Sequence, residues 1–191
     1  MSPMDPTRMT GGEALVAALV DHGVDTVFGI PGTHNLEIYK HLALQGVTHV
    51  SPRHEQGAGY AADGYARTTG KVGVAVVTSG PALLNTATAV AQAWSDSVPV
   101  LVVSPGLPLR HPALGNGLLH ETRDQGAALR AVAAASLRAT SVEEIPTAVA
   151  QAFALMTSGR PRPVHLEVPL DVLAEAADVV RVSPAVRPAA H

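Results

Sequence analysis

Short apolar runs rich in β-branched residues alternate with amphipathic segments along most of the chain. The apolar runs have the length of buried strands, and the segments between them place apolar residues at helical spacing. These runs predict six strands, at about 26–30, 48–52, 72–77, 98–103, 137–139 and 164–168. The amphipathic segments predict helices at about 10–23, 34–45, 53–70, 81–94, from about 123, and at 143–158.

Repeated strand–helix units of this size predict an α/β fold with three α/β/α layers and a six-stranded parallel sheet. In such sheets ligands bind at the carboxyl ends of the strands. Chemistry is therefore expected in the segments that follow the strands, at 29–34, 53–57, 78–81 and 104–106.

The pattern predicts one domain, residues 10–173, between a disordered N-terminus (1–9) and a linker-like tail (174–191). Periodicity is lost in the tail, and its last ten residues contain two prolines. The stretch 104–122 is rich in proline, glycine and histidine and predicts a long loop, a feature that is commonly functional.

Composition narrows the classes of function. Apolar residues make up 47% of the chain and charged residues 15%, which is typical of a folded globular domain. The net charge of -3 argues against a nucleic-acid partner. No apolar stretch approaches the roughly 20 residues needed to span a membrane. The chain has no cysteine, and its first nine residues have no apolar signal core, so a cytoplasmic location is expected.

Glu55 is the first candidate for chemistry, because it lies where a predicted strand turns into a helix. A carboxylate there is stabilised by the helix dipole, by about 0.3–1 kcal/mol. Spacing alone favours this structural role. A functional role requires further residues.

Four segments supply them. They occur in this order: FGIPGTHNLEIY (28–39), PRHEQGAGYAADGYARTTGKVGVAVVTSGP (52–81), AWSDSVPVLVVS (93–104) and GRPRPVHLEVPLDV (159–172). Together they closely resemble the N-terminal, aminopyrimidine-binding (Pyr) domain of the acetolactate synthase, benzoylformate decarboxylase and pyruvate oxidase superfamily. The resemblance covers about residues 10–173.

The resemblance implies that Glu55 is the catalytic residue that hydrogen-bonds the aminopyrimidine ring of thiamine diphosphate. In the family this contact favours the imino tautomer, whose nitrogen removes the proton from thiazolium C2. That role requires a carboxyl group able to share a proton near neutral pH. Partial burial favours this by disfavouring the charged form.

The resemblance also implies the rest of the site. Thr33 and His34 are candidate substrate-facing groups, although His34 fits a solvated residue at a helix start equally well. The implied cofactor-binding residues are Pro31, Gly32, Glu55, Thr78, Ser79, Gly80 and Asn85, the last in a region that the family uses for subunit contact.

A narrower resemblance concerns the phrases GIPGTHNLEIY, PRHEQGAG, GNGLLHE (115–121) and RPRPVHLEVPLDVL. They are similar to 5-guanidino-2-oxopentanoate decarboxylases, so the expected function is one half of a 2-oxo-acid decarboxylase or lyase. An acetolactate synthase-type carboligase is the alternative. Acetolactate synthases usually carry a glutamine soon after the 99–103 strand, where this chain has Ser104-Pro105-Gly106.

The family's G-D-G…N motif, which holds Mg²⁺ and the diphosphate, is missing, and Asp63-Gly64 stands in the wrong context. Mg²⁺ is therefore expected only through a partner diphosphate-binding domain, and the isolated chain is expected to be inactive. It is then a fragment, one subunit of a split enzyme, or a non-catalytic relic or partner-binding module. By resemblance, a homodimer or tetramer is expected.

Other motifs carry less weight. Gly57, Gly59 and Ala62 match a loose dinucleotide-binding pattern, but inside a predicted helix instead of a strand-to-helix turn. A generic nucleotide-binding domain is therefore the weakest alternative. His120-Glu121 could form a metal pair, although a lone pair in a loop is usually solvated. The sequence thus predicts no metal site of its own.

Overall fold

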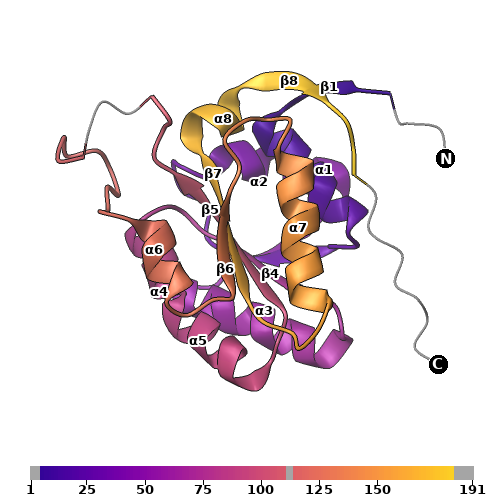
Figure 1. Ribbon diagram of the computed structural model, residues 1–191, viewed down its shortest axis with the longest axis vertical. Coiled ribbons are helices and arrows are strands. Elements are labelled where there is room, and N and C mark those ends of the chain that lie inside the picture. Colours follow the sequence, from indigo (N-terminus) through magenta and orange to yellow (C-terminus); the bar gives the residue numbers. More distant parts are fainter. Residues whose placement is uncertain (1–4, 111–113, 183–191) are drawn as a thin grey trace.

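The computed structural model describes residues 5–110 and 114–182 (Figure 1). Its centre is a six-stranded sheet in which each pair of neighbouring strands is parallel. The predicted α/β fold is therefore confirmed. The strands, in spatial order, are β3 (Thr48–Val50), β2 (Thr26–Phe28), β4 (Gly73–Val76), β5 (Val100–Gly106), β7 (Val164–Pro169) and β6 (Ala135–Arg138).

Helices cover both faces of the sheet, and each face has its own apolar cluster. One cluster involves α1 (Gly11–Asp21), α2 (Leu36–Leu42), α7 (Ile145–Thr157) and α8 (Leu170–Ala174). The other involves α3 (Glu55–Thr69), α4 (Pro81–Asn85), α5 (Ala87–Asp96) and α6 (Gln125–Arg130). A short 3-10 helix, η1 (Ala43–Gln45), follows α2.

The central strands send alternate side chains to the two clusters. In β4, Val74 and Val76 belong to one cluster and Ala75 to the other. In β5, Leu101 and Val102 divide in the same way. A strand that is covered on both faces needs apolar residues at every position, which explains the continuous apolar runs in the sequence.

The predicted helix 81–94 is two helices, because the helix is interrupted at Thr86. This residue is fully buried, and its hydroxyl donates a hydrogen bond of 2.7 Å to the Leu83 carbonyl. A threonine hydroxyl that bonds back to the preceding turn competes with the helical pattern and bends the chain. As a result, α4 is a separate short helix that ends at Asn85.

The predicted loop begins later than the sequence indicated. Ser104, Pro105 and Gly106 continue β5 and pair with Glu167–Pro169 of β7. Residues 111–113 of that loop lie outside the described residues.

Two terminal predictions were wrong in part. Thr7–Thr10 form β1, which pairs antiparallel with β8 (Ala176–Val179) in a small second sheet. Residues 7–9 are therefore not disordered, and 176–179 are not a linker. The pairing joins segments far apart in the sequence and packs Val179 onto the core, which local pattern does not reveal. The remaining parts, 1–4 and 183–191, lie outside the described residues.

Candidate functional site

The strand order reverses between β2 and β4, and we refer to the region at their carboxyl ends as the β2–β4 crevice, because parallel α/β sheets form a ligand crevice at such a reversal. From β2 the chain passes to β3 on one side, and then returns to β4 on the other side. The connections after β2 and β4 therefore leave in opposite directions. Parallel α/β sheets bind ligands at the point between two such strands. The predicted turns 29–34 and 78–81 follow these two strands.

Gly32 brings the two turns into contact. A β-carbon at this position would lie 2.7 Å from Cγ2 of Thr78. Any residue other than glycine would therefore require one of the two turns or the Thr78 side chain to move. Asn35, which is fully buried, closes the first turn from inside: its Oδ1 accepts from the Gly32 N–H at 2.8 Å, and its Nδ2 donates to the Ile30 carbonyl at 3.1 Å. Pro31 and Thr33 are left on the exposed side of this turn.

His34 links the turns a second time. Its Nδ1 lies 2.6 Å from Oγ of Ser79, a residue that is 2% exposed. Burial lowers the pKa of His34 below its ordinary value, and the neighbouring His120 lowers this pKa further. His34 is therefore not simply a solvated residue at a helix start, because its ring is half-buried and held by the second turn.

Glu55 is the first residue of α3, and its side chain is joined to the end of α4. Its Oε2 accepts a hydrogen bond from Nδ2 of Asn85 at 3.0 Å. Among the described residues, Oε1 has no hydrogen-bond partner. Glu55 is half-buried and lies in the first turn of α3, where the helix dipole favours a carboxylate. The structure thus brings together two residues that the sequence singled out separately.

The structure does not join all the predicted residues directly. Within the described residues, no hydrogen bond connects Glu55 to His34 or to the turn at Thr78–Gly80. The link runs through α4, which begins directly after that turn and ends at Asn85. The site therefore consists of two parts: a pair of turns between β2 and β4, and a carboxylate–amide pair between α3 and α4.

Sequence reasoning did not place two contributors in this site: His120 was considered only as a metal pair with Glu121, and Gln125 was not considered. His120 lies beside His34, with ring centroids 5.4 Å apart, and its Nδ1 is 3.4 Å from Oγ1 of Thr78. Gln125 is buried, and its Oε1 accepts from the Gly80 N–H at 2.8 Å. No local signal links either one to the turn, because each reaches it from a loop or helix more than 40 residues away. No group of three metal-ligating side chains occurs within 5–110 and 114–182.

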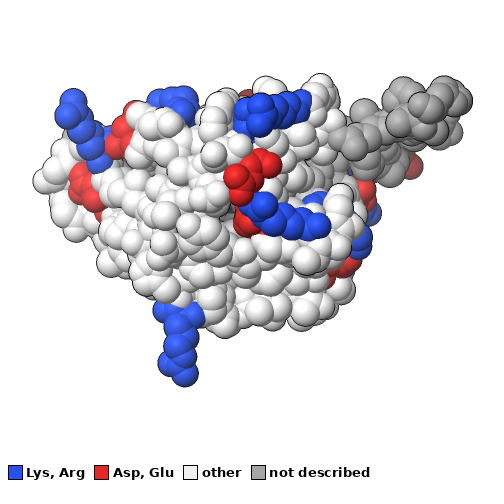
Figure 2. Space-filling model, turned by 90° about the horizontal axis from the view of Figure 1, so that it is seen from below, with Lys and Arg blue, Asp and Glu red and all other residues white. Residues whose placement is uncertain are grey.

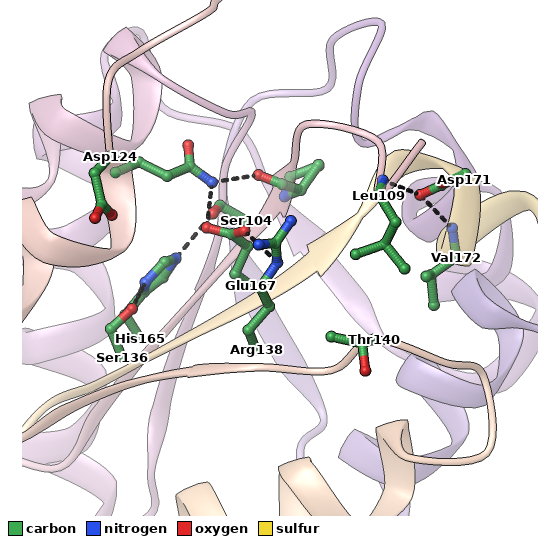
Figure 3. A network of polar contacts seen from close by, with 12 residues as sticks. Ser104, Leu109, Asp124, Ser136, Arg138, Thr140, His165, Glu167, Asp171 and Val172 are labelled. Atoms are coloured by element: carbon green, nitrogen blue, oxygen red, sulfur yellow. Dashed lines mark hydrogen bonds and ion pairs between the residues drawn. The ribbon is translucent and has the colours of Figure 1, made fainter. Parts of the chain in front are cut away.

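Gln125 extends the site into a polar network with Pro105 at the end of β5 and Glu167 at the end of β7. Its Nε2 donates to the Pro105 carbonyl and to Oε2 of Glu167, both at 2.8 Å. Glu167 also pairs with Arg138 at 3.0 Å (Figure 3). A pocket of about 410 Å³ lies over this network, lined in part by Arg123 and Leu107.

His165 occupies the sheet next to this network. Its ring is fully buried between Ser104 of β5, at 2.9 Å from Nε2, and Ser136 of β6, at 2.7 Å from Nδ1 (Figure 3). Burial lowers the pKa of His165 to about 3, and the charge of Arg130 contributes to the same shift. A neutral histidine therefore bridges three strands, and it has no exposed atom through which to act on a ligand.

The side of the molecule that carries α3, α4 and α5 has broad uncharged areas around a group of charged side chains near the middle of the view (Figure 2). Exposed apolar side chains on these helices are Tyr60, Leu84 and Trp94. No helix in the described part of the chain has the length and apolar character needed to cross a membrane.

Comparison with known proteins identifies relatives of this sequence. The chain is 53% identical over 173 residues to "Probable 2-ketoarginine decarboxylase AruI" of Pseudomonas aeruginosa. The aligned region covers 90% of this chain and 31% of that protein. It is 44% identical over 181 residues to an acetolactate synthase of Arthrospira platensis, covering 93% and 31%. It is 41% identical over 171 residues to the acetolactate synthase isozyme 2 large subunit of Escherichia coli, covering 90% and 31%.

The chain thus spans about 31% of the length of these relatives. Residues 9–128 match the family described as thiamine pyrophosphate enzyme, N-terminal TPP binding domain. This match contains both turns of the crevice, Glu55 and Asn85. Because it covers more than half of the sequence, the chain belongs to the thiamine pyrophosphate enzyme family and contains its N-terminal TPP binding domain.

Proposed function

We propose that this chain is the aminopyrimidine-binding part of a thiamine-diphosphate-dependent 2-oxo-acid decarboxylase. The observation that carries the proposal is the half-buried carboxylate of Glu55 beside the β2–β4 crevice. One of its oxygens is held by Asn85, and the other has no partner among the described residues.

The donor set fits the cofactor. An aminopyrimidine ring presents N–H groups and ring nitrogens, and a carboxylate oxygen without a partner can accept from them or hold a shared proton. In this proposal Glu55 holds that proton at Oε1, and Asn85 orients the carboxylate through Oε2. Bound thiamine diphosphate supplies the electron sink for loss of carbon dioxide from a 2-oxo acid.

The remaining predicted residues take positions consistent with this proposal. Gly32 and Thr78 form the contact between the two turns, and Ser79 is held by His34. Gly80 lies against His120, and Pro31 lies on the exposed side. We assign the cofactor-facing wall to Pro31, Gly32, Thr78, Ser79 and Gly80. Thr33 and His34 are the proposed substrate-facing groups, because they follow directly on the same turn.

A second domain completes the proposed site. The relatives are about three times longer than the matched region, and we propose that a diphosphate-binding domain supplies Mg²⁺ and the diphosphate contacts. The exposed apolar residues of α3, α4 and α5 support docking of such a domain or of a second copy, in a dimer or tetramer. A cytoplasmic location belongs to the same proposal.

The name of the Pseudomonas relative supports decarboxylation of a guanidino-bearing 2-oxo acid. The names of the two other relatives support the alternative, carboligation of an acetolactate synthase type. The products separate the two: a decarboxylase releases an aldehyde, whereas a synthase forms a new carbon–carbon bond.

The experiment combines the 191-residue chain with the unmatched part of the Pseudomonas relative, thiamine diphosphate and Mg²⁺. Carbon dioxide release from 2-ketoarginine and from pyruvate is measured, with aldehyde and acetolactate assayed in parallel. We expect activity that depends on both chains and that falls at least a hundredfold in Glu55→Gln. Full activity of Glu55→Gln would remove this carboxylate from its role.

A further inference from the structure

His120 has an unusual backbone. Its φ is 59°, and Ser97 is the only other non-glycine residue of the described chain with a positive φ. Such a conformation costs free energy in a residue with a side chain, and it persists where the surroundings hold it. Here the surroundings are the crevice turn: a β-carbon on Gly80 would lie 2.2 Å from the His120 carbonyl oxygen. Gly80 therefore makes room for His120.

The rings of His34 and His120 form a pair over this turn. They meet edge to face, at an interplanar angle of 76°. Each ring directs Nδ1 to a hydroxyl of the turn, His34 to Ser79 at 2.6 Å and His120 to Thr78 at 3.4 Å. Within the described residues, neither Nε2 has a hydrogen-bond partner. Two imidazole nitrogens beside the Thr78–Gly80 turn are therefore without a partner among the described residues.

No carboxylate is hydrogen-bonded to the pair within the described residues. Glu121, the next residue of the loop, accepts from the backbone N–H groups of Gly115 and Leu118. On the other elements around the crevice, Glu37 of α2 pairs with Lys40, and Glu55 of α3 accepts from Asn85. Gln125, which holds Gly80, is uncharged. A proton on either ring consequently lacks a resident counter-ion and is opposed by a proton on the other ring.

We propose that His34 and His120 form a two-histidine anion site that takes up one proton between them and binds the carboxylate of the 2-oxo acid substrate through Nε2. His120 is then a specificity-determining residue of the site. The assignment of the anion rests on the proposed function, whereas the coupling of the two rings does not. Burial lowers the pKa of His34 most, and the neighbouring His120 lowers this pKa further.

Proton uptake follows from the same geometry. A bound carboxylate supplies the missing negative charge, which favours the protonated pair. Binding of the anion therefore draws a proton from solution, and the affinity for the anion falls as the pH rises. A neutral ester of the same acid lacks this charge and has no such effect.

The experiment follows the histidine Cε1–H resonances of the 191-residue chain by NMR during pH titrations. Titrations are made without ligand, with pyruvate and with methyl pyruvate. We expect pyruvate to move both resonances toward their protonated positions and to raise the pKa of His34, and methyl pyruvate to leave them unchanged. Unassigned resonances are identified by the variants below.

His120→Asn is the main variant, because asparagine tolerates positive φ, and His120→Gly removes the ring without any backbone strain. Without the second ring, the pKa of His34 should rise in the absence of ligand. The dissociation constant for pyruvate should increase about tenfold, the loss of one hydrogen bond to a charged group. His22→Gln, at the far end of α1, is the matched control and should change neither value.

If the pKa of His34 were unchanged in both His120 variants, the proposed coupling between the two rings would be refuted. Equal effects of pyruvate and methyl pyruvate, or no effect of either, would overturn the carboxylate site. These measurements contain no cofactor, so they separate the two proposals. A pair that responds to pyruvate beside a fully active Glu55→Gln enzyme refutes only the proposed function, and the reverse outcome refutes only the anion site.

Discussion

Glu55 and Asn85 share a hydrogen bond of 3.0 Å that joins the start of α3 to the end of α4. The two residues belong to different strand–helix units, 30 positions apart. Their contact connects the carboxylate to the short helix that begins at the Thr78–Gly80 turn. The position of Glu55 therefore depends on the same segment that forms the β2–β4 crevice.

Asn85 is expected to orient Glu55, so Asn85→Asp should impair the enzyme assembled from the chain and the proposed diphosphate-binding domain. A second carboxylate would replace the amide donor and repel Glu55. We expect kcat to fall about tenfold or more, with little change in the thermal unfolding of the chain, because Asn85 is exposed. The neighbouring exposed Thr88→Ala serves as the control. Wild-type kcat in Asn85→Asp would contradict the orienting role.

Gly80 is expected to be irreplaceable by alanine. Its φ of 60° is strained for alanine, and the new β-carbon would collide with the His120 carbonyl. We expect Gly80→Ala to lower the free energy of unfolding by about 2–4 kcal/mol, measured in urea. Gly70→Ala isolates the backbone component, because Gly70 has a φ of 70° and open space around it. That variant should cost about 1 kcal/mol, and equal losses in both would show that the contact with His120 is absent.

Gln125 is expected to stabilise the fold through its buried amide. It holds the Gly80 N–H, the Pro105 carbonyl and Glu167. Gln125→Ala removes the buried hydrogen bonds to these three groups, so the free energy of unfolding should fall by about 2–4 kcal/mol. Gln92→Ala removes an exposed glutamine that donates to Asp96 and should cost less than about 0.5 kcal/mol. Chemical denaturation of both variants decides the comparison.

His165 is expected to make the fold sensitive to acid. Its folded pKa, about 3, lies below its ordinary value of 6.5, so below pH 6.5 the unfolded chain binds a proton that the folded chain does not. Its contribution is fully present above pH 6.5 and is lost as the pH falls toward 3. The slope is about 1.4 kcal/mol per pH unit for this group.

Urea unfolding of wild type and His165→Gln between pH 7 and 4.5 measures this slope. Acidification should destabilise wild type more steeply than the variant, since glutamine does not titrate. Other histidines with lowered pKa, His34 and His41, remain in both proteins and cancel in the comparison. Parallel curves would show that His165 is not a buried neutral group in solution.

The sequence by itself determined the layers of this protein. Apolar runs such as 72–77 predict strands covered on both faces. The helical segments between these runs act as crossover connections, which join parallel strands. Local chemistry also fits the predicted start of the helix at about residue 10, where Thr10 accepts from the Glu13 N–H. Glu55 and the two crevice turns were located by their positions after predicted strands, and the resemblance implied their roles.

The tertiary structure decided everything that depends on contacts between distant segments. The β1–β8 pairing, the approach of His120 to His34, and the position of Gln125 under Gly80 join residues from about 45 to more than 160 positions apart. Their local patterns resemble a disordered terminus, a solvated loop and an ordinary helix start. Side-chain periodicity reports which face of an element is buried, but it carries no information about which partner covers that face.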